Sequence, residues 1–105
     1  MKSRRTKACD ISQKVKKIVW ERDNERCIVC RNQNAMPNAH YIPRSQNGLG
    51  IEENVITLCQ DCHYKYDQTI RRKELKEYFK HYLQNKYSDW KEEDLIYKKG
   101  VNYGK

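Results

Sequence analysis

The chain of 105 residues contains no long apolar run, and none approaches the roughly 18 apolar residues that a transmembrane helix needs. Its basic N-terminus is not followed by the apolar core of a signal peptide, so we expect no secretory signal. Internal repeats and low-complexity segments are also missing. These absences exclude a membrane-spanning protein and make a cytoplasmic location the expectation.

Hydrophobic residues are scarce at 37% of the chain, whereas charged residues make up 34%. A chain of this length is predicted to form a single domain with a small core, and such domains usually need a disulfide or a metal ion for stability. Because thiols stay reduced in the cytosol, a metal ion is favoured over disulfides. The available cysteines are Cys9, Cys27, Cys30, Cys59 and Cys62.

The chain is strongly basic, with 22 Lys and Arg against 14 Asp and Glu and a net charge of +8. A balance of this size favours a polyanionic partner, which is either nucleic acid or an anionic membrane surface. Residues 1–9 contain a cluster of basic side chains. They form either a frayed terminus or a basic arm that reaches a phosphate backbone.

Residues 10–23 predict the first helix. Asp10 is the expected N-cap, and Gln13 stands three positions later, as in a capping box. Apolar residues recur at helical spacing at Ile11, Val15, Ile18 and Val19. Cys9, just before this helix, has no partner at metal-binding spacing and is expected to be a spare thiol.

Residues 70–97 predict the C-terminal helices. The apolar stripe of the longer helix consists of Leu75, Tyr78, Phe79, Tyr82 and Leu83. Tyr87 interrupts this pattern, and Asp89 predicts the cap of a last short helix. His81 falls off the stripe and is expected on the surface. Residues 98–105 predict a loosely held tail.

Two Cys-x-x-Cys pairs begin at Cys27 and Cys59. Two intervening residues allow both sulfurs of a pair to face one ion. A single pair is also typical of redox proteins, but two pairs in one short domain favour a four-thiolate structural zinc. The insert of 28 residues between Cys30 and Cys59 is longer than a simple zinc ribbon needs. We therefore expect the insert to contain a site of its own.

The insert predicts a strand, a loop, a second strand and a helix. The first strand is expected over residues 39–42 and ends at Pro43, which cannot continue a ladder. Residues 46–50 include two glycines and predict a turn. The β-branched run 55–58 predicts the second strand, and residues 59–66 predict the helix after it.

Two histidines stand at the ends of these elements: His40 on the first strand and His63 on the first turn of the helix. Phosphodiester hydrolysis needs a base that activates water and a cation that stabilises the phosphate. A histidine with a near-neutral pKa suits the first task. Asn54 is expected to bridge backbone groups of the loop that aims His40. Arg44 and Lys65 are candidate contacts for DNA phosphate oxygens.

The run from Cys27 to Asp67 resembles HNH endonucleases, and small phage- and prophage-encoded members in particular. The resemblance is carried by Ala-His-Tyr-Ile-Pro-Arg-Ser, Gly-Leu-Gly-Ile-Glu-Glu-Asn and Leu-Cys-x-x-Cys-His. It implies a small α+β fold with a ββα-metal, treble-clef-like core over residues 27–67 and flanking helices. It also implies an endodeoxyribonuclease that hydrolyses phosphodiester bonds with a divalent metal. The implied ligands of the structural zinc are Cys27, Cys30, Cys59 and Cys62.

By position, the resemblance makes His40 the general base, Asn54 the middle asparagine and His63 a ligand of the catalytic ion. That ion is expected to be Mg²⁺ or Mn²⁺, with Ni²⁺ or Zn²⁺ as alternatives. Many members carry a His or Asp ligand just before the general base, where this chain has Ala39. Asp67, one helical turn after His63, is either a compensating oxygen ligand or an ordinary surface carboxylate.

Other functions stay open from the sequence. A decayed HNH site would leave a non-catalytic zinc-dependent DNA-binding module, and Ala39 is the residue that favours this alternative. A zinc-stapled protein-interaction adaptor is a third interpretation. The resemblance to phage proteins implies the host cytoplasm as the location and the phage packaging machinery, beside DNA, as a partner. Asn47 stands where related sequences often have glycine, and asparagine tolerates left-handed backbone.

Overall fold

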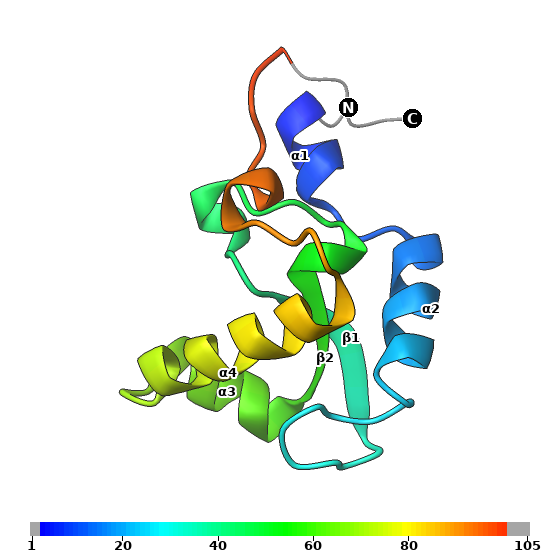
Figure 1. Cartoon of the computed structure of the whole chain (residues 1–105), viewed down its shortest axis with the longest axis vertical. Helices are drawn as coiled ribbons and strands as arrows, with labels where there is room; N and C mark the ends of the chain where they lie inside the picture. The colour runs from blue at the N-terminus through cyan, green and yellow to red at the C-terminus, as the bar shows by residue number, and fades with distance from the viewer. Residues whose placement is uncertain (1–2, 101–105) are drawn as a thin grey trace.

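A computed structural model describes residues 3–100 and has a small α+β fold (Figure 1). A two-stranded antiparallel sheet lies between α2 on one side and α3 and α4 on the other (Figure 1). No helix within residues 3–100 is long and apolar enough to cross a membrane. In chain order the elements are α1 (Arg4–Cys9), α2 (Gln13–Arg22), β1 (Ala35–His40), the 3₁₀ helices η1 (Arg44–Gln46) and η2 (Glu52–Asn54), β2 (Val55–Cys59), α3 (Gln60–Gln68), α4 (Arg72–Lys86) and the 3₁₀ helix η3 (Glu92–Leu95).

The first strand differs from the prediction over residues 39–42, because β1 begins four residues earlier and ends at His40. Its register against β2 is irregular between Met36 and Ala39, where Pro37 has no N–H for the ladder. A bulge therefore lets a proline stand inside a paired strand. The second strand coincides with the β-branched run 55–58 and extends it by one residue.

Residues 4–9 form the short helix α1, so the expectation of a frayed terminus is wrong for this segment. Ser3 caps the helix by accepting a hydrogen bond from the Thr6 N–H at 3.1 Å. Residues 1–2 lie outside the described part of the chain. A serine cap and the packing of the buried Cys9 provide order that the basic composition of this segment does not indicate.

The predicted cap of the next helix is also wrong, because Ser12 rather than Asp10 caps α2. The Ser12 hydroxyl accepts from the Val15 N–H at 3.1 Å. The Asp10 carboxylate instead pairs with the Arg44 guanidinium at 2.6 Å. A tertiary ion pair has displaced the local capping interaction.

The C-terminal elements begin and end close to their predicted positions. Helix α4 begins at Arg72, and Ile70 in the preceding turn is 99% exposed. Leu75, Phe79 and Leu83 of the apolar stripe are buried, whereas the His81 side chain is 72% exposed. The last short helix is the 3₁₀ segment η3, and no side chain caps it, so the predicted cap at Asp89 is wrong. Of the predicted tail, residues 101–105 lie outside the described part.

A buried carboxylate joins three elements in the core. Asp23, only 3% exposed, accepts hydrogen bonds from the Arg22 side chain of α2, the Thr57 backbone N–H of β2 and the Tyr82 hydroxyl of α4. The Arg22 guanidinium also donates to the carbonyls of Glu52 and Val55 at 2.7 Å each. This network adds specific order to a core with few large apolar side chains.

Replacing Asp23 by Ala should lower the free energy of unfolding by about 3–5 kcal/mol, because it leaves the buried Arg22 charge and the Thr57 N–H without their partner. Chemical denaturation followed by circular dichroism, with zinc in excess, measures this change. Asp89→Ala is the control, since Asp89 is exposed, and it should change stability by at most about 0.5 kcal/mol. Equal effects of the two substitutions would contradict a structural role for the network.

Candidate functional site

The four cysteines of the two Cys-x-x-Cys pairs gather at one end of the sheet. Their sulfur atoms all lie within 4.8 Å of one another, and the Cys30 and Cys59 sulfurs are 3.5 Å apart. A tetrahedral site with Zn–S bonds of about 2.3 Å places neighbouring sulfurs about 3.8 Å apart. The cluster therefore fits a metal ion of zinc's size and preference for thiolates. Its members are Cys27, Cys30, Cys59 and Cys62.

The backbone around the cluster favours thiolate at one position. Burial alone would raise the pKa of Cys27, but backbone N–H groups of Cys30, Cys59 and Val29 lower it to about 7. Burial raises the pKa of the Cys62 thiol. The Cys62 backbone N–H donates to the Cys59 sulfur at 3.4 Å. Binding of a metal ion would then displace the thiol protons of the cysteines whose pKa is raised by burial.

Cys9 stays apart from this cluster. It is fully buried, and burial raises the pKa of its thiol. The functional contact of this residue comes from its backbone carbonyl, which lies 2.9 Å from the His40 Nε2 atom. A carbonyl only accepts, so the bond requires the hydrogen on Nε2 and leaves Nδ1 as the acceptor nitrogen of the ring.

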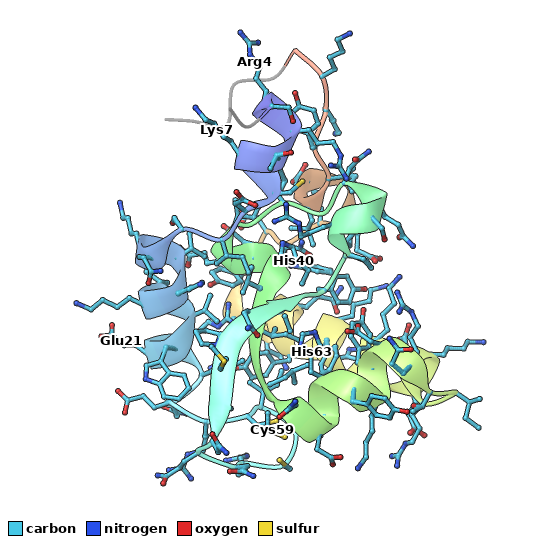
Figure 2. The ribbon with its side chains drawn as sticks, turned by 180° about the vertical axis from the view of Figure 1, so that it is seen from behind. Arg4, Lys7, Glu21, His40, Cys59 and His63 are labelled. Carbon is cyan, nitrogen blue, oxygen red and sulfur yellow. The ribbon has the colours of Figure 1, made fainter. Side chains whose placement is uncertain are left out.

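His40 is the last residue of β1 and is partly buried beneath α1 (Figure 2). Burial is the main cause that lowers its pKa from the ordinary value. The Cys9 carbonyl and Asp10 raise the pKa, whereas Arg44 and His63 lower it. The imidazole is therefore held neutral near physiological pH, with its protonated nitrogen tied to the backbone.

Asn54 holds the loop that follows His40. Its side chain is fully buried, and its Oδ1 atom accepts from the Ile42 N–H at 2.8 Å. Its Nδ2 atom donates to the carbonyls of Leu49 at 2.8 Å and Ile42 at 3.2 Å. The Asn54 carbonyl also accepts from the Tyr41 N–H at 2.8 Å. These bonds continue the pairing beyond the end of β1 and close the loop 42–49.

His63 and Asp67 face each other on α3, where the His63 Nε2 and Asp67 Oδ2 atoms are 3.3 Å apart. Both side chains are partly exposed. Within residues 3–100, the four cysteines are the only group in which three or more His, Cys, Asp or Glu ligand atoms converge. A cation at His63 and Asp67 would have two side-chain ligands here. Ala39, at the position of the missing family ligand, is buried and supplies none.

The two candidate phosphate contacts both lie in ion pairs. The Arg44 Nη1 atom of η1 donates to Asp10 Oδ1 at 2.6 Å and to the Cys9 carbonyl at 3.2 Å. The Lys65 Nζ atom lies 3.2 Å from Asp61 Oδ2 on the exposed face of α3. Arg44 therefore shares the Cys9 carbonyl with His40 and is engaged by Asp10. A phosphate would have to compete with Asp10 for the Arg44 guanidinium.

Sequence reasoning missed the contribution of α1 to the surroundings of His40. Arg5 donates to the Asn47 side chain and, at 2.6 Å, to the Arg44 carbonyl. The Gly50 N–H donates to the Ala8 carbonyl at 2.9 Å. A Cβ atom at Gly50 would lie 2.1 Å from the Asp10 carbonyl oxygen, so glycine permits this close approach. Backbone contacts of this kind leave no signal in a sequence.

The HNH endonuclease family model matches residues 27–69, a segment that includes both cysteine pairs, His40 and His63. The chain belongs to the HNH endonuclease family. Anaredoxin from Nostoc sp. (strain PCC 7120 / SAG 25.82 / UTEX 2576) is 38% identical over 55 residues, which is 51% of this chain and 72% of anaredoxin. No solved structure matches the chain significantly. Helices α1 and α2 lie outside the HNH domain.

Purified HNH protein should contain one zinc ion per chain, and Cys59→Ser should lose it together with most of the folded structure, because the cluster supplies stability that a small core lacks. Elemental analysis and circular dichroism measure both effects. Cys9→Ala is the matched control, since Cys9 is equally buried but outside the cluster, and it should keep the full metal content. A Cys59→Ser protein with one zinc ion would contradict the assignment.

Asn54→Ala should lower the free energy of unfolding by about 2–4 kcal/mol, because the Ile42 N–H and the carbonyls of Ile42 and Leu49 lose their buried partner. Denaturant titration with bound zinc measures the loss. The control is Asn85→Ala on the exposed surface of α4, which should leave stability nearly unchanged. A stable Asn54→Ala protein would show that the loop is held by other contacts.

Proposed function

We propose that this chain is a metal-dependent endonuclease that hydrolyses phosphodiester bonds of DNA. The observation that carries the proposal is the bond that the Cys9 carbonyl of α1 makes to His40 of the HNH domain. Such a bond presents a neutral imidazole with one defined acceptor nitrogen, and this is the state that a general base needs.

In the proposed mechanism, His40 Nδ1 takes a proton from the attacking water. The carbonyl of Cys9 holds the ring in place and stabilises the imidazolium that forms, since the Nε2–H is already bonded to it. The buried amide of Asn54 keeps the loop beyond β1 in position. Asn54 therefore acts as a positioning residue for His40.

His63 and Asp67 would hold the catalytic cation, in what we propose to be a ββα-metal site built from β1, β2 and α3. A bound Mg²⁺ or Mn²⁺ supplies charge stabilisation for the phosphate and the leaving oxygen. Two protein ligands suit such a hard cation, which commonly completes its coordination with water and substrate phosphate. The four cysteines would hold the structural zinc.

DNA is the proposed substrate because the chain carries a net charge of +8. Arg44 is the proposed phosphate contact next to His40, and Lys65 the one next to His63. Each would exchange its carboxylate partner, Asp10 or Asp61, for a phosphate oxygen. The host cytoplasm and a role beside phage packaging machinery stay predictions from the resemblance.

A second candidate function is a non-catalytic, zinc-dependent DNA-binding module. It is favoured by Ala39, which replaces a usual metal ligand and leaves His63 and Asp67 as a pair. This module would share the zinc cluster and the basic surface, and it would bind DNA without cutting it.

Wild-type protein should convert supercoiled plasmid to open-circular or linear DNA with Mg²⁺ or Mn²⁺, and His40→Ala should lower the rate constant by about 10²- to 10⁴-fold. His81→Ala is the matched control, because His81 is exposed on α4 and outside residues 27–69, and it should cut at the wild-type rate. An equal rate for His40→Ala would show that His40 is not the base. Plasmid binding without nicking under any metal would favour the DNA-binding module.

The pH dependence provides a separate check on His40. Its pKa is lowered from the ordinary histidine value of 6.5, so the neutral, active base should persist from alkaline pH down to below that value. At saturating cation, the cleavage rate should be flat through neutral pH and should fall only on further acidification. A rate that still rises steeply from about pH 7 to 8 would contradict a lowered pKa for the base.

A further inference from the structure

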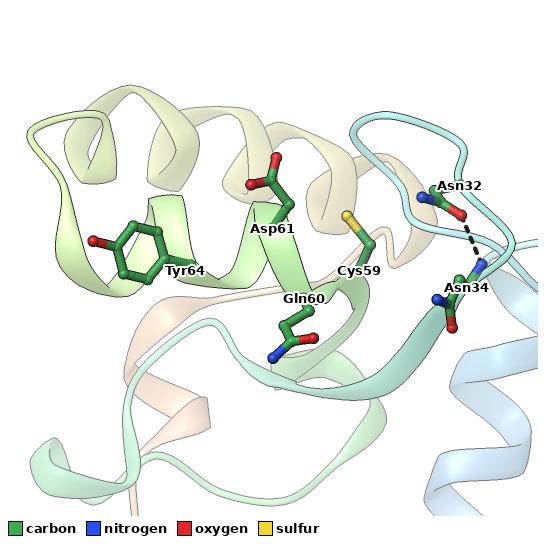
Figure 3. Close-up of a pocket in the computed structure, with 6 residues that line it drawn as sticks. All are labelled: Asn32, Asn34, Cys59, Gln60, Asp61 and Tyr64. Carbon is green, nitrogen blue, oxygen red and sulfur yellow. Dashed lines mark hydrogen bonds between the residues drawn. The ribbon is translucent and has the colours of Figure 1, made fainter.

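An open hollow of about 450 Å³ lies beside the first turns of α3, next to the cysteine cluster (Figure 3). Its volume is in the range of sites that hold small ligands or parts of larger ones. Of its lining residues, the proposed function uses only Cys59, as a zinc ligand, and Asp61, as the partner of Lys65. The lining residues are Asn32, Asn34, Cys59, Gln60, Asp61 and Tyr64.

We propose that this hollow is a nucleobase subsite of the DNA substrate, which receives the base of an unpaired nucleotide close to the scissile phosphate. The assignment rests on the proposed nuclease function for the position of the phosphate, but it also makes a claim about binding that can be tested without cleavage.

The position of the hollow follows from the spacing of residues on α3. Gln60, His63, Tyr64 and Asp67 stand at i, i+3, i+4 and i+7, so they share one face of the helix. With a rise of about 1.5 Å per residue, Gln60 and Tyr64 lie within roughly 5 Å of His63 along the helix axis. The hollow is therefore close enough to a phosphate held at His63 to receive the base of a nearby nucleotide of the same strand.

The side chains of the hollow have the chemistry that a base needs. Tyr64 is 59% exposed, and its ring is a platform on which a base can stack. The side-chain amides of Asn34 and Gln60 have no hydrogen-bond partner among residues 3–100. The Asn32 Oδ1 atom accepts from the Asn34 backbone N–H at 2.8 Å (Figure 3). This bond fixes the Asn32 side-chain amide and leaves the NH₂ group of Asn32 to donate to a base. Amides of this kind offer paired donors and acceptors to base edges.

The charge of the hollow argues against a phosphate as its occupant. No Lys or Arg lines it, and the Asp61 carboxylate at the rim, with its side chain 74% exposed, is paired with Lys65 at 3.2 Å and would be released when Lys65 turns to a phosphate. A carboxylate accepts well from the amino group of a base. The site therefore favours adenine, cytosine and guanine, which carry such an amino group, over thymine, which has none.

Stacking on Tyr64 also restricts the form of the DNA. A base inside a duplex is already stacked on its neighbours, and a base must leave that stack before it can reach a side chain in a hollow. Single-stranded ends, mismatches and loops provide such bases at the lowest cost in free energy. The subsite thus predicts a preference for DNA with an unpaired A, C or G, rather than T, beside the cut.

Binding of a single-stranded oligonucleotide to zinc-loaded His40→Ala protein tests the subsite without cleavage. In this background, Tyr64→Ala should weaken binding of an A- or C-containing strand by about 5- to 150-fold, as expected for the loss of one stacked base. Tyr64→Phe keeps the ring and should bind like the parent. The dependence of affinity on salt should stay the same in all three proteins, because phosphate contacts are unchanged.

A fluorescence experiment gives a direct readout of the hollow. The Tyr64→Trp protein should be quenched on addition of the oligonucleotide, after subtraction of the signal of the parent protein. Ile70→Trp is the matched control, since Ile70 is 99% exposed in the turn between α3 and α4 and outside the hollow. Its signal should change little. Equal binding by Tyr64→Ala, or a Tyr64→Trp protein whose fluorescence is unchanged with DNA bound, would overturn the subsite.

Cleavage maps separate this inference from the proposed function. Wild-type cut sites in an unpaired region should be enriched in A, C or G over T at one position beside the cut. A double variant, Asn34→Ala with Gln60→Ala, should lose that enrichment and keep its zinc content. Cutting with no base preference in the wild type would refute the subsite and leave the nuclease intact. Binding and quenching without any cleavage would refute the nuclease and support the subsite.

Discussion

The convergence of four thiols is the interaction on which the rest of this structure depends. It joins the loop after α2 to the junction of β2 and the first turn of α3. Because Cys59 and Cys62 stand at the junction of β2 and α3, the cluster sets the direction in which α3 leaves the sheet. The position of His63 relative to His40 follows from that direction.

The second organising feature is that the HNH domain does not complete the surroundings of His40 by itself. The carbonyl bonded to His40 belongs to α1, which lies outside residues 27–69. The loop after His40 is also paired with the C-terminal segment, where Gly48 forms an isolated bridge to Ile96 and the Leu49 N–H donates to the Leu95 carbonyl at 2.8 Å. Segments from both ends of the described chain therefore hold one catalytic candidate.

Local patterns predicted the regular elements well and the helix caps poorly. The β-branched run 55–58 and the stripe around Phe79 are a strand and a helix because their periodicity matches a buried face. The left-handed backbone at Asn47, with φ of 66°, agrees with the tolerance expected of asparagine. The cap of α2 was wrong, since an ion pair to Arg44 engages Asp10, a partner 34 residues away that no local rule includes.

Residue order alone was enough to identify the family, the cysteines that gather and the succession of strand, strand and helix, because ligand spacing and hydrophobic period are local properties of the chain. The folded chain was needed to learn how His40 is held, that Arg44 is engaged by Asp10, and that an amide-lined hollow opens beside Tyr64. Each of these depends on residues that are distant in sequence or on a backbone carbonyl. A carbonyl is the same at every position, so its contacts are set by packing and not by residue type.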